Sequence, residues 1–418
     1  MSSFRFLHAA DIHLDSPLHG LARYEGVPVE EVRRATRAAF DNLIGFAIEE
    51  GVDFVVIAGD LFDGDWKDMG TGLYFARAMG LLDREGIPAF VLAGNHDAAS
   101  VITRTVPWPP NVRLFGSRRP ETHLLEELGV AVHGQSFATA AVTDNLVIGY
   151  PDAREGMFNL GVLHTALAGR EGHATYAPCD VGDLLTKRYD YWALGHVHSF
   201  EIVSTDPYVV FPGNTQGRNV RETGPKGAAL VEVADRQVVS VEPVELDIIR
   251  WARLEVDCTD ADPDRVRSVI RDALVGAQLR DAAGRPLIVR LVLTGKNEHA
   301  AEIRDDELAL RDDCRALALA VSPDLWLEKV QVRLRERRSD GSSEIPGDLA
   351  AIIAGAESDA ELAEALSEDL APFISATRAS LGDAGGDDFL REAAQAGDWS
   401  KVIGQAASGL QPRLSAEG

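Results

Sequence analysis

The sequence predicts a layered α/β fold, because short apolar runs alternate with stretches of helical periodicity through its first half. Three runs rich in β-branched and apolar residues are predicted strands: 4–10 (FRFLHAA), 53–59 (DFVVIAG) and 88–94 (PAFVLAG). Between the first two, Phe40, Leu43, Ile44 and Ala47 recur at the spacing of one helix face, and a second helix is predicted around 69–84. A β-α-β-α-β order is typical of a sheet whose strands are covered by helices.

Further strand-like runs follow, and we expect them to form a second sheet that packs on the first. They are 145–150 (NLVIGY), 159–164 (NLGVLH), 189–196 (YDYWALGH), 208–211 (YVVF) and 227–233 (GAALVEV). The two sheets and their helices together predict a first domain at 1–245.

A change of pattern near 245–250 predicts a compact α+β unit at 250–338. Its elements are a strand at 251–258, a helix beginning at Asp262 and Pro263, a strand at 286–295, a helix at 305–321 and a strand at 325–334. Asp262 is the expected N-cap, with Pro263 at the first helical position. A polar Ser/Gly-containing linker follows, and 345–418 is predicted to be an acidic helical segment rich in alanine.

Composition excludes several classes of protein. A chain of 418 residues is too long for one ordinary core, so two or three domains are expected. No apolar run approaches the roughly eighteen residues of a membrane span, and the start of the chain lacks the apolar region of a secretion signal. Cys179, Cys258 and Cys314 lack the C-x-x-C spacing of a structural zinc site and cannot form a disulfide framework. We therefore expect a cytoplasmic protein with no membrane partner.

The formal net charge of −25 bears on nucleic-acid binding. Proteins that hold nucleic acid by broad nonspecific electrostatics usually present a basic face. The charge therefore disfavours such a surface. It is compatible with a small local basic groove, or with binding through a partner subunit.

Residues able to bind a metal stand at the ends of five predicted strands. They are Asp11 and His13, Asp60, Asn95 with His96 and Asp97, His164, and His196 with His198. In an open α/β sheet, ligands bind at the carboxyl ends of the strands, so these residues are expected to converge although they are far apart in sequence. The glycines beside them let the chain turn sharply where each strand ends.

This set of side chains offers nitrogen and oxygen ligands and no thiolate. Imidazoles favour a transition metal over magnesium, and carboxylates with an amide suit Mn or Fe as readily as Zn. The set is large enough for two ions bridged by one carboxylate, at a separation of about 3.5–4 Å. Two such ions clamp a phosphoryl group and activate a bound water. The pattern therefore indicates hydrolysis of a phosphoester.

The blocks DIH, GD, GNHD, H and GHVH, in this order across 4–235, resemble the calcineurin-like metallophosphoesterase superfamily. The stretches LHAADIHLDSP, GDLFD, VHGQSF and PGNTQGRNVRETGPKG are similar to its DNA repair exonuclease branch, which contains SbcD-like and YhaO-like proteins. The resemblance implies a four-layer α/β/β/α sandwich, then a small α+β capping domain and a helical C-terminal segment. It also implies two divalent ions, Mn or alternatively Fe or Zn, with DNA and an SMC-like coiled-coil ATPase as partners and a possible homodimer.

The resemblance also implies a role for each residue of the motif. The first metal is expected on Asp11, His13, Asp60 and His198, and the second on Asp60, Asn95, His164 and His196, with Asp60 as the bridge. His96 is expected beside the scissile phosphate, where it stabilises charge or protonates the leaving oxygen. Asp97 is expected to hold the His96 imidazole in orientation.

The stretch GDLFD departs from the nuclease pattern at Asp63. Nuclease members of the branch commonly carry a histidine at this position, where it steers substrate or nucleophile, whereas YhaO-like members share the Asp. A carboxylate repels a phosphodiester unless a metal or a lysine compensates. On this hypothesis Asp63→His raises activity on duplex DNA. Arg218 and Asn219, in the glycine-containing loop after FPGN, are candidate phosphate contacts.

Three functions remain open from the sequence. The first is a Mn-dependent phosphodiesterase that acts on DNA ends as an exonuclease or endonuclease in repair. The second keeps the chemistry but acts on a small or cyclic nucleotide, which suits the charge of −25. The third is a metal-stabilised, non-catalytic scaffold for the ATPase, for which a complete ligand set and His96 have no chemical purpose.

Overall fold

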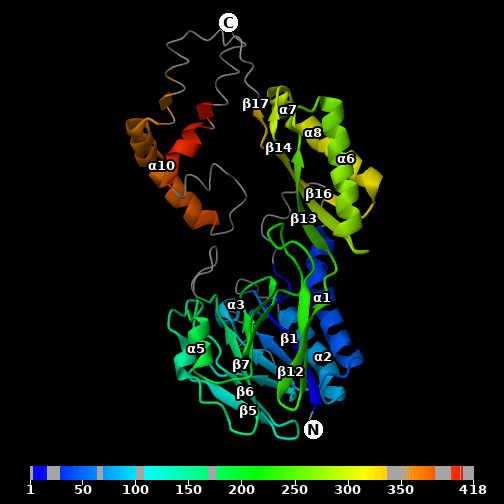
Figure 1. Cartoon of the computed structure of the whole chain (residues 1–418), viewed down its shortest axis with the longest axis vertical. Helices are drawn as coiled ribbons and strands as arrows, with labels where there is room; N and C mark the ends of the chain where they lie inside the picture. Colours follow the sequence, from blue (N-terminus) through cyan, green and yellow to red (C-terminus); the bar gives the residue numbers. More distant parts are fainter. Residues whose placement is uncertain are drawn as a thin grey trace. The chain divides into compact units, whose positions relative to one another are not determined.

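The computed structural model describes most of the chain (Figure 1), which divides into two compact units. The described residues are 3–16, 29–63, 69–99, 108–167, 176–336, 352, 355–356, 358–381, 397–404 and 406–407. One unit consists of 1–295 and 306–334, and the other of 296–305 and 335–418. The domain boundaries predicted at 245, 250, 338 and 345 stay predictions, and most of the predicted linker at 337–348 lies outside the described residues.

The first sheet of the larger unit has six strands in the order β12-β11-β1-β2-β3-β4. Its strands are β1 (Ser3–Ala9), β2 (Phe54–Ala58), β3 (Ala89–Leu92), β4 (Val112–Leu114), β11 (Gly227–Ala234) and β12 (Gln237–Glu245). Strands β1 to β4 run parallel, as the β-α-β-α-β pattern predicts, so the carboxyl ends of β1, β2 and β3 share one edge.

One predicted strand belongs to a different sheet than expected. The run at 227–233 forms β11, which pairs antiparallel with β1 in the first sheet rather than joining the second. Its Ala229, Val231 and Val233 enter the core between the two sheets, beside Phe4 and Phe6 of β1. Pairing there also satisfies the outer backbone groups of β1, which would otherwise form an open sheet edge.

The second sheet also has six strands, in the order β5-β6-β7-β8-β10-β9. They are β5 (Glu121–Leu125), β6 (Val130–Gly134), β7 (Phe158–His164), β8 (Tyr191–Gly195), β9 (Phe200–Thr205) and β10 (Tyr208–Pro212). The expected strand at 145–150 is wrong, because this segment is a 3-10 helix, η2 (Leu146–Gly149). Asn145 caps the turn by accepting the Val147 N–H, and Ile148 is exposed, so the segment lacks the continuous burial of a strand.

The two sheets pack face to face, and helices cover their outer faces. Helices α1 (Val29–Glu49) and α2 (Met69–Arg84) pack on the first sheet through a core that includes all four apolar residues of the predicted helix face (Figure 1). Strand β2 contacts β7 and β8 across the middle of the domain. Helix α5 (Val181–Leu185) and η2 pack on the outer face of the second sheet. The predicted four-layer α/β/β/α sandwich is confirmed.

A three-stranded parallel sheet follows in the order β13-β14-β16. Its elements are β13 (Arg250–Asp257), α6 (Pro263–Arg280), β14 (Leu287–Thr294), α8 (Glu307–Val321) and β16 (Leu325–Val332). Asp262 caps α6 by accepting the Arg265 N–H, with Pro263 at its first position, as predicted. We call this group of elements the cap.

The smaller unit is described only in part. It contains β15 (Lys296–Asn297) paired with β17 (Arg335–Glu336), α7 (Ala300–Asp305) and α10 (Ala360–Leu381). Helix α10 agrees with the expectation of helix in the C-terminal segment. Among the described residues no helix is long and apolar enough to cross a membrane.

Candidate metal centre

The carboxyl ends of five strands bring the predicted ligands together. Asp11 and His13 follow β1, Asp60 follows β2, Asn95 begins the short helix α3 (Asn95–Ala99) after β3, His164 ends β7, and His196 and His198 follow β8. Three groups have ligand atoms that all lie within 4.8 Å of one another: Asp11, His13 and His198; His13, Asp60 and His96; and Asp60, His164 and His196.

The backbone at several of these positions is in the left-handed region, which L-residues rarely adopt. The φ angles are +51° at Asp11, +45° at His13, +52° at Asp60 and +99° at His196. Such conformations cost on the order of 1–3 kcal/mol each and persist only where the surroundings enforce them. They turn the chain immediately after each strand, so that the side chain points over the end of the sheet.

Glycines allow the two sheets to approach closely at this edge. A Cβ on Gly195 would lie 2.0 Å from the Ala58 carbonyl oxygen, and one on Gly59 would lie 2.4 Å from Nδ1 of His164. Gly59 also has a φ of +100°. Gly59 is therefore needed for the predicted sharp turn. Gly195 is needed because a side chain there would collide with the backbone at Ala58 of the opposite sheet.

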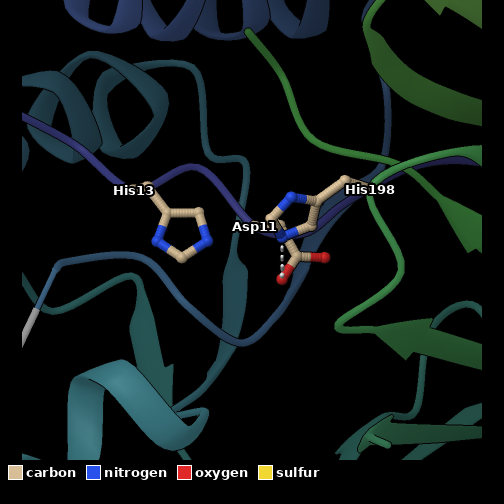
Figure 2. Close-up of side chains that lie close together, drawn as sticks. All are labelled: Asp11, His13 and His198. Carbon is tan, nitrogen blue, oxygen red and sulfur yellow. Dashed lines mark ion pairs between the residues drawn. The ribbon is translucent and has the colours of Figure 1, made fainter. Parts of the chain in front are cut away.

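Asp11, His13 and His198 form the first half of the centre, and Figure 2 shows their side chains converging from two separate loops. Oδ2 of Asp11 accepts the His196 backbone N–H at 2.8 Å, and its Oδ1 lies 3.7 Å from Nε2 of His198. Among the described residues, neither Oδ1 of Asp11 nor either ring nitrogen of His13 has a hydrogen-bond partner, although all three atoms are buried. Buried polar atoms are rarely left in this state without a ligand.

Asp60, His164, His196 and Asn95 form the second half. Oδ1 of Asp60 accepts the His96 backbone N–H, and its Oδ2 lies 3.5 Å from Nε2 of His164 and 3.8 Å from Nε2 of His13. Oδ1 of Asn95 is 3.0 Å from Nε2 of His164. Asp60 is thus the carboxylate shared by both halves, in the position that the sequence predicts for a bridge.

A backbone contact fixes the orientation of the His164 imidazole. Its Nδ1 donates to the Ala58 carbonyl oxygen at 2.9 Å, which leaves Nε2 to face Asp60. This is the common arrangement of a metal-binding histidine, in which the nitrogen that does not bind the ion donates a hydrogen bond.

The electrostatics of these buried groups favour a cation between them. Burial alone would lower the pKa of His164, but the charges of Asp60 and Asp11 raise it to about 9. Burial alone would raise the pKa of Asp60, but His164 and His13 hold it far below its usual value. The His164 imidazole therefore holds a proton beside an ionised Asp60, at a place where a divalent ion would replace that proton. The nitrogen and oxygen donors fit two such ions, and they contain no soft sulfur ligand.

Similarity to known proteins assigns the family. The chain is 35% identical over 300 residues to the uncharacterized metallophosphoesterase YhaO of Bacillus subtilis (strain 168), an alignment that covers 71% of this chain and 72% of the relative. Residues 4–200 match the family described as Calcineurin-like phosphoesterase, and residues 251–335 match Metallophosphoesterase YhaO, middle domain. The chain belongs to the calcineurin-like phosphoesterases, in their YhaO-like branch.

Two more distant relatives carry the name DNA double-strand break repair protein Mre11. The protein of Thermoplasma acidophilum is 24% identical over 316 residues, which covers 68% of this chain and 75% of the relative. The protein of Haloferax volcanii is 28% identical over 289 residues, which covers 66% and 61%. As a phosphoesterase of this family, the chain is a metal-dependent hydrolase whose clusters of His and Asp are the candidate sites for divalent ions.

The role expected for Asp97 in this phosphoesterase is wrong. Asp97 does not hold His96; it accepts the backbone N–H groups of Leu61, Phe62 and Gly94 at 2.7–3.0 Å. Its buried carboxylate therefore joins the turn after β2 to the turn after β3, because the short helix α3 directs it back beneath those loops. Burial and the nearby Asp60 charge raise the pKa of Asp97 to about 7.

Asp63 holds His96 instead. Its Oδ1 lies 2.8 Å from Nδ1 of His96, and its Oδ2 accepts from Ser16 and lies 3.8 Å from Nη1 of Arg218. Burial alone would lower the pKa of His96 and raise that of Asp63. Their hydrogen bond has the opposite effect: the pKa of His96 is raised, and the pKa of Asp63 is lowered well below its usual range. From the sequence, Asp63 is expected to repel a phosphodiester; in the structure its carboxylate is paired with His96 and lies near the Arg218 guanidinium.

Arg218 is brought to the centre, and Asn219 is not. The Arg218 side chain is 16% exposed and extends between Asp63 and Glu222. Asn219 is exposed, and its side-chain oxygen accepts the Arg221 N–H within its own loop.

Sequence reasoning misses one buried acidic residue, Glu222, whose Oε1 lies 2.8 Å from Nδ1 of His198. No spacing rule marks it. The single available signal is an acidic residue four positions after Arg218.

Proposed function

We propose that this chain is a dinuclear-metal-dependent phosphodiesterase that cleaves DNA as an exonuclease or endonuclease in repair. The observation that carries the proposal is the arrangement of two ligand groups around one shared carboxylate, Asp60, with His96 beside them. Such a centre suits in-line displacement at phosphorus, in which both the attacking and the leaving oxygen carry developing charge.

The chain provides a ligand set for each ion. Asp11, His13, Asp60 and His198 would hold the first, and Asp60, Asn95, His164 and His196 the second. When bound, the two ions supply Lewis acidity that activates a water and neutralises phosphoryl charge. Manganese is the metal we expect, with iron or zinc as alternatives that the same donors accept.

His96 and Arg218 provide the remaining chemistry. His96 donates Nδ1–H to Asp63, which leaves Nε2 to carry the proton that the leaving oxygen needs. The Asp63 carboxylate raises the pKa of His96, which favours retention of that proton. Arg218 lies beside Asp63, on the same side of the centre as His96. Its guanidinium would bind a phosphate oxygen there.

The charge balance around the centre favours a phosphodiester over a phosphomonoester. Arg218 is already paired with Glu222 and lies 3.8 Å from Asp63, and His96 is paired with Asp63. These pairs leave little excess positive charge beyond that of the ions. A singly charged phosphodiester suits such a site better than a doubly charged monoester.

DNA is the substrate we favour because of the relatives that are named DNA double-strand break repair protein Mre11. With a net charge of −25, contact with DNA is expected in a local groove only. An SMC-like coiled-coil ATPase is the proposed protein partner, a homodimer the proposed assembly, and the cytoplasm the proposed location.

Degradation of end-labelled linear DNA tests this function. The full chain, loaded with Mn²⁺, is incubated with single-stranded and duplex DNA carrying a label at either end. We expect Mn²⁺-dependent degradation that is abolished in His96→Ala, while the metal content of the variant stays at the wild-type level. Full metal occupancy with no hydrolysis of any phosphodiester, alone or with the ATPase, would overturn the proposal.

The charge of −25 also supports a second candidate function, cleavage of small or cyclic nucleotides. In that case the Mn²⁺-loaded protein hydrolyses bis-p-nitrophenyl phosphate and cyclic nucleotides but leaves every DNA substrate intact. The same assay therefore separates the two candidates.

A further inference from the structure

The loop at 213–226 carries a buried carboxylate that the chemistry above does not use. Glu222 is 8% exposed, and it accepts hydrogen bonds from three residues: two in its own loop, and His198. Its partners are the Asn214 side chain at 2.9 Å, the Arg218 backbone N–H at 2.7 Å, the Arg218 guanidinium at 3.2 Å and Nδ1 of His198 at 2.8 Å. One side chain thus joins a metal ligand to the candidate phosphate-binding arginine.

The contact with His198 determines which ring nitrogen faces the centre. Because a carboxylate only accepts, Nδ1 of His198 carries the proton, and Nε2 is left facing Oδ1 of Asp11 at 3.7 Å. Such a partner fixes the tautomer and the orientation of a metal-binding imidazole, and its loss typically weakens metal binding 10–100-fold.

The contact with Arg218 determines where the guanidinium lies. Glu222 binds both the backbone and the side chain of Arg218, so the arginine is held at each end of its flexible stem. Nη1 then lies 3.8 Å from Asp63, on the side of the centre where His96 is held.

Hydrogen bonds to neighbouring elements hold the loop, and therefore Glu222, in place. Gln216 binds the backbone of Ile248 and Ile249, and Nε1 of Trp251 in β13 donates to the Gly217 carbonyl oxygen at 3.0 Å. Lys226 also donates to the His198 carbonyl oxygen. The orientation of Glu222 is therefore set by packed elements on both sides of the loop.

We propose that Glu222 is a positioning residue that orients His198 toward the first metal and Arg218 toward the substrate phosphate. The first part depends only on the ligand set, and the second rests on the proposed phosphodiesterase function.

Metal titration of Glu222→Gln tests the first part. Metal-free protein is titrated with MnCl2 by isothermal calorimetry, and free Mn²⁺ is followed by electron paramagnetic resonance. We expect affinity for one of the two ions to fall 10–100-fold while the other binds as in the wild type. Glu222→Asp keeps the charge but shortens the reach to His198, so it is expected to weaken the same ion even if Glu222→Gln does not fold.

A matched control separates positioning from the general effect of losing a buried acid. Glu328 in the cap is 6% exposed and forms a bidentate pair with Arg290 at 2.5–2.6 Å, far along the chain from every ligand. Glu328→Gln removes the same kind of buried pair and is expected to bind both ions as the wild type does. Thermal unfolding of both metal-free variants shows whether they are comparably folded.

Arg218→Met tests the second part. It leaves the contact between Glu222 and His198, so both ions should bind normally, while KM for bis-p-nitrophenyl phosphate rises. Wild-type affinity for both ions in Glu222→Gln and Glu222→Asp would overturn the proposal. Loss of one ion in those variants, with no phosphodiester hydrolysis by the wild type, would instead refute the proposed function and leave the positioning of His198 intact.

Discussion

At the scale of single residues, one hydrogen bond of Asp63 changes the role that the sequence motif suggests for this aspartate. Taken alone, an aspartate three residues after Asp60 is a negative charge that disfavours a phosphodiester. In the structure it is the hydrogen-bond partner of His96 and lies near Arg218. The negative charge is therefore paired with the His96 imidazole and lies near the Arg218 guanidinium, and the imidazole gains a fixed orientation and a raised pKa.

Asp63→Asn removes the partner that orients the proton donor His96, so kcat is expected to fall about 10²-fold, the lower end of what a positioned proton donor contributes. The raised pKa of His96 keeps its proton on as pH rises, so the wild-type rate should fall only above that pKa. Without the Asp63 charge the pKa of His96 decreases, and the alkaline limb of the pH–rate profile moves to lower pH. The profile is measured with bis-p-nitrophenyl phosphate at saturating Mn²⁺. An unmoved alkaline limb with normal metal content would contradict the role of the pair.

Asp63→His is expected to lower activity on duplex DNA, in contrast to the increase that the motif alone suggests. A histidine at this position would place a second imidazole beside His96 and remove the nearby counter-charge of Arg218. The measurement is the rate of degradation of labelled duplex DNA, with Asp63→Asn as the reference variant. A rate above that of the wild type would restore the steering hypothesis.

At the scale of elements, the sequence predicts most strands and the convergence of the candidate ligands, but it does not predict the contacts between loops. The strand ends that carry Asp11, Asp60 and His164 are visible because apolar runs stop abruptly at a polar residue. The partners of His96 and His198 are not visible, because Asp63 and Glu222 reach them across loops that are distant in sequence. A candidate ligand can be predicted from the strand that it ends, whereas the residue that orients it can be found only from the tertiary packing of the loops.

The same distinction explains the two errors in the fold. The segment at 145–150 has the composition of a strand, but the Asn145 cap favours a turn, and Val147 is the one buried residue within η2 (Leu146–Gly149). Strand β11 has the expected pattern, yet it joins the first sheet because β1 offers an unpaired edge there, and not the second sheet as its position in the chain suggests. Local periodicity contains no information about which open edge a strand will join.

The loop at 213–226 links the cap strand β13 to the centre, and Trp251→Phe tests that link. The substitution removes the hydrogen bond to the Gly217 carbonyl oxygen and is expected to cost about 1 kcal/mol of unfolding free energy. Since Arg218 follows Gly217 directly, KM for a phosphodiester should also rise while metal content stays normal. Stability is measured by urea unfolding and KM with bis-p-nitrophenyl phosphate.

Trp192→Phe is the matched control for this prediction. Trp192 is fully buried in the outer core of the second sheet, and among the described residues its Nε1 has no hydrogen-bond partner. Replacing it removes a ring of the same size without removing a hydrogen bond. An equal rise of KM in both variants would show that loss of packing, and not the anchor of the loop, changes the centre.

At the scale of the whole molecule, stability should depend on metal because the candidate ligands come from both sheets of the sandwich. Asp11, His13 and Asp60 come from the first sheet, and His164 and His198 come from the second. An ion at a hundred times its Kd stabilises the folded state by about 2.7 kcal/mol per site. Chelation by EDTA is therefore expected to lower Tm by several degrees, as measured by calorimetry with and without added MnCl2. An unchanged Tm would contradict a centre that spans the two sheets.

The size of this metal effect should grow with pH. In the metal-free protein the pKa of His164 is raised from 6.5 to about 9 by Asp60 and Asp11, so its protonated form stabilises the fold below pH 6.5. That contribution is lost as pH rises through 9, while an incoming ion no longer has to displace the proton. The Tm difference between metal-bound and metal-free protein is therefore expected to widen from pH 6.5 to pH 9. Calorimetry at pH 6.5, 7.5 and 9 measures it, and His164→Asn is expected to remove most of the widening because asparagine does not titrate. A difference that narrows over this range would show that His164 is not protonated between the two carboxylates in the metal-free protein.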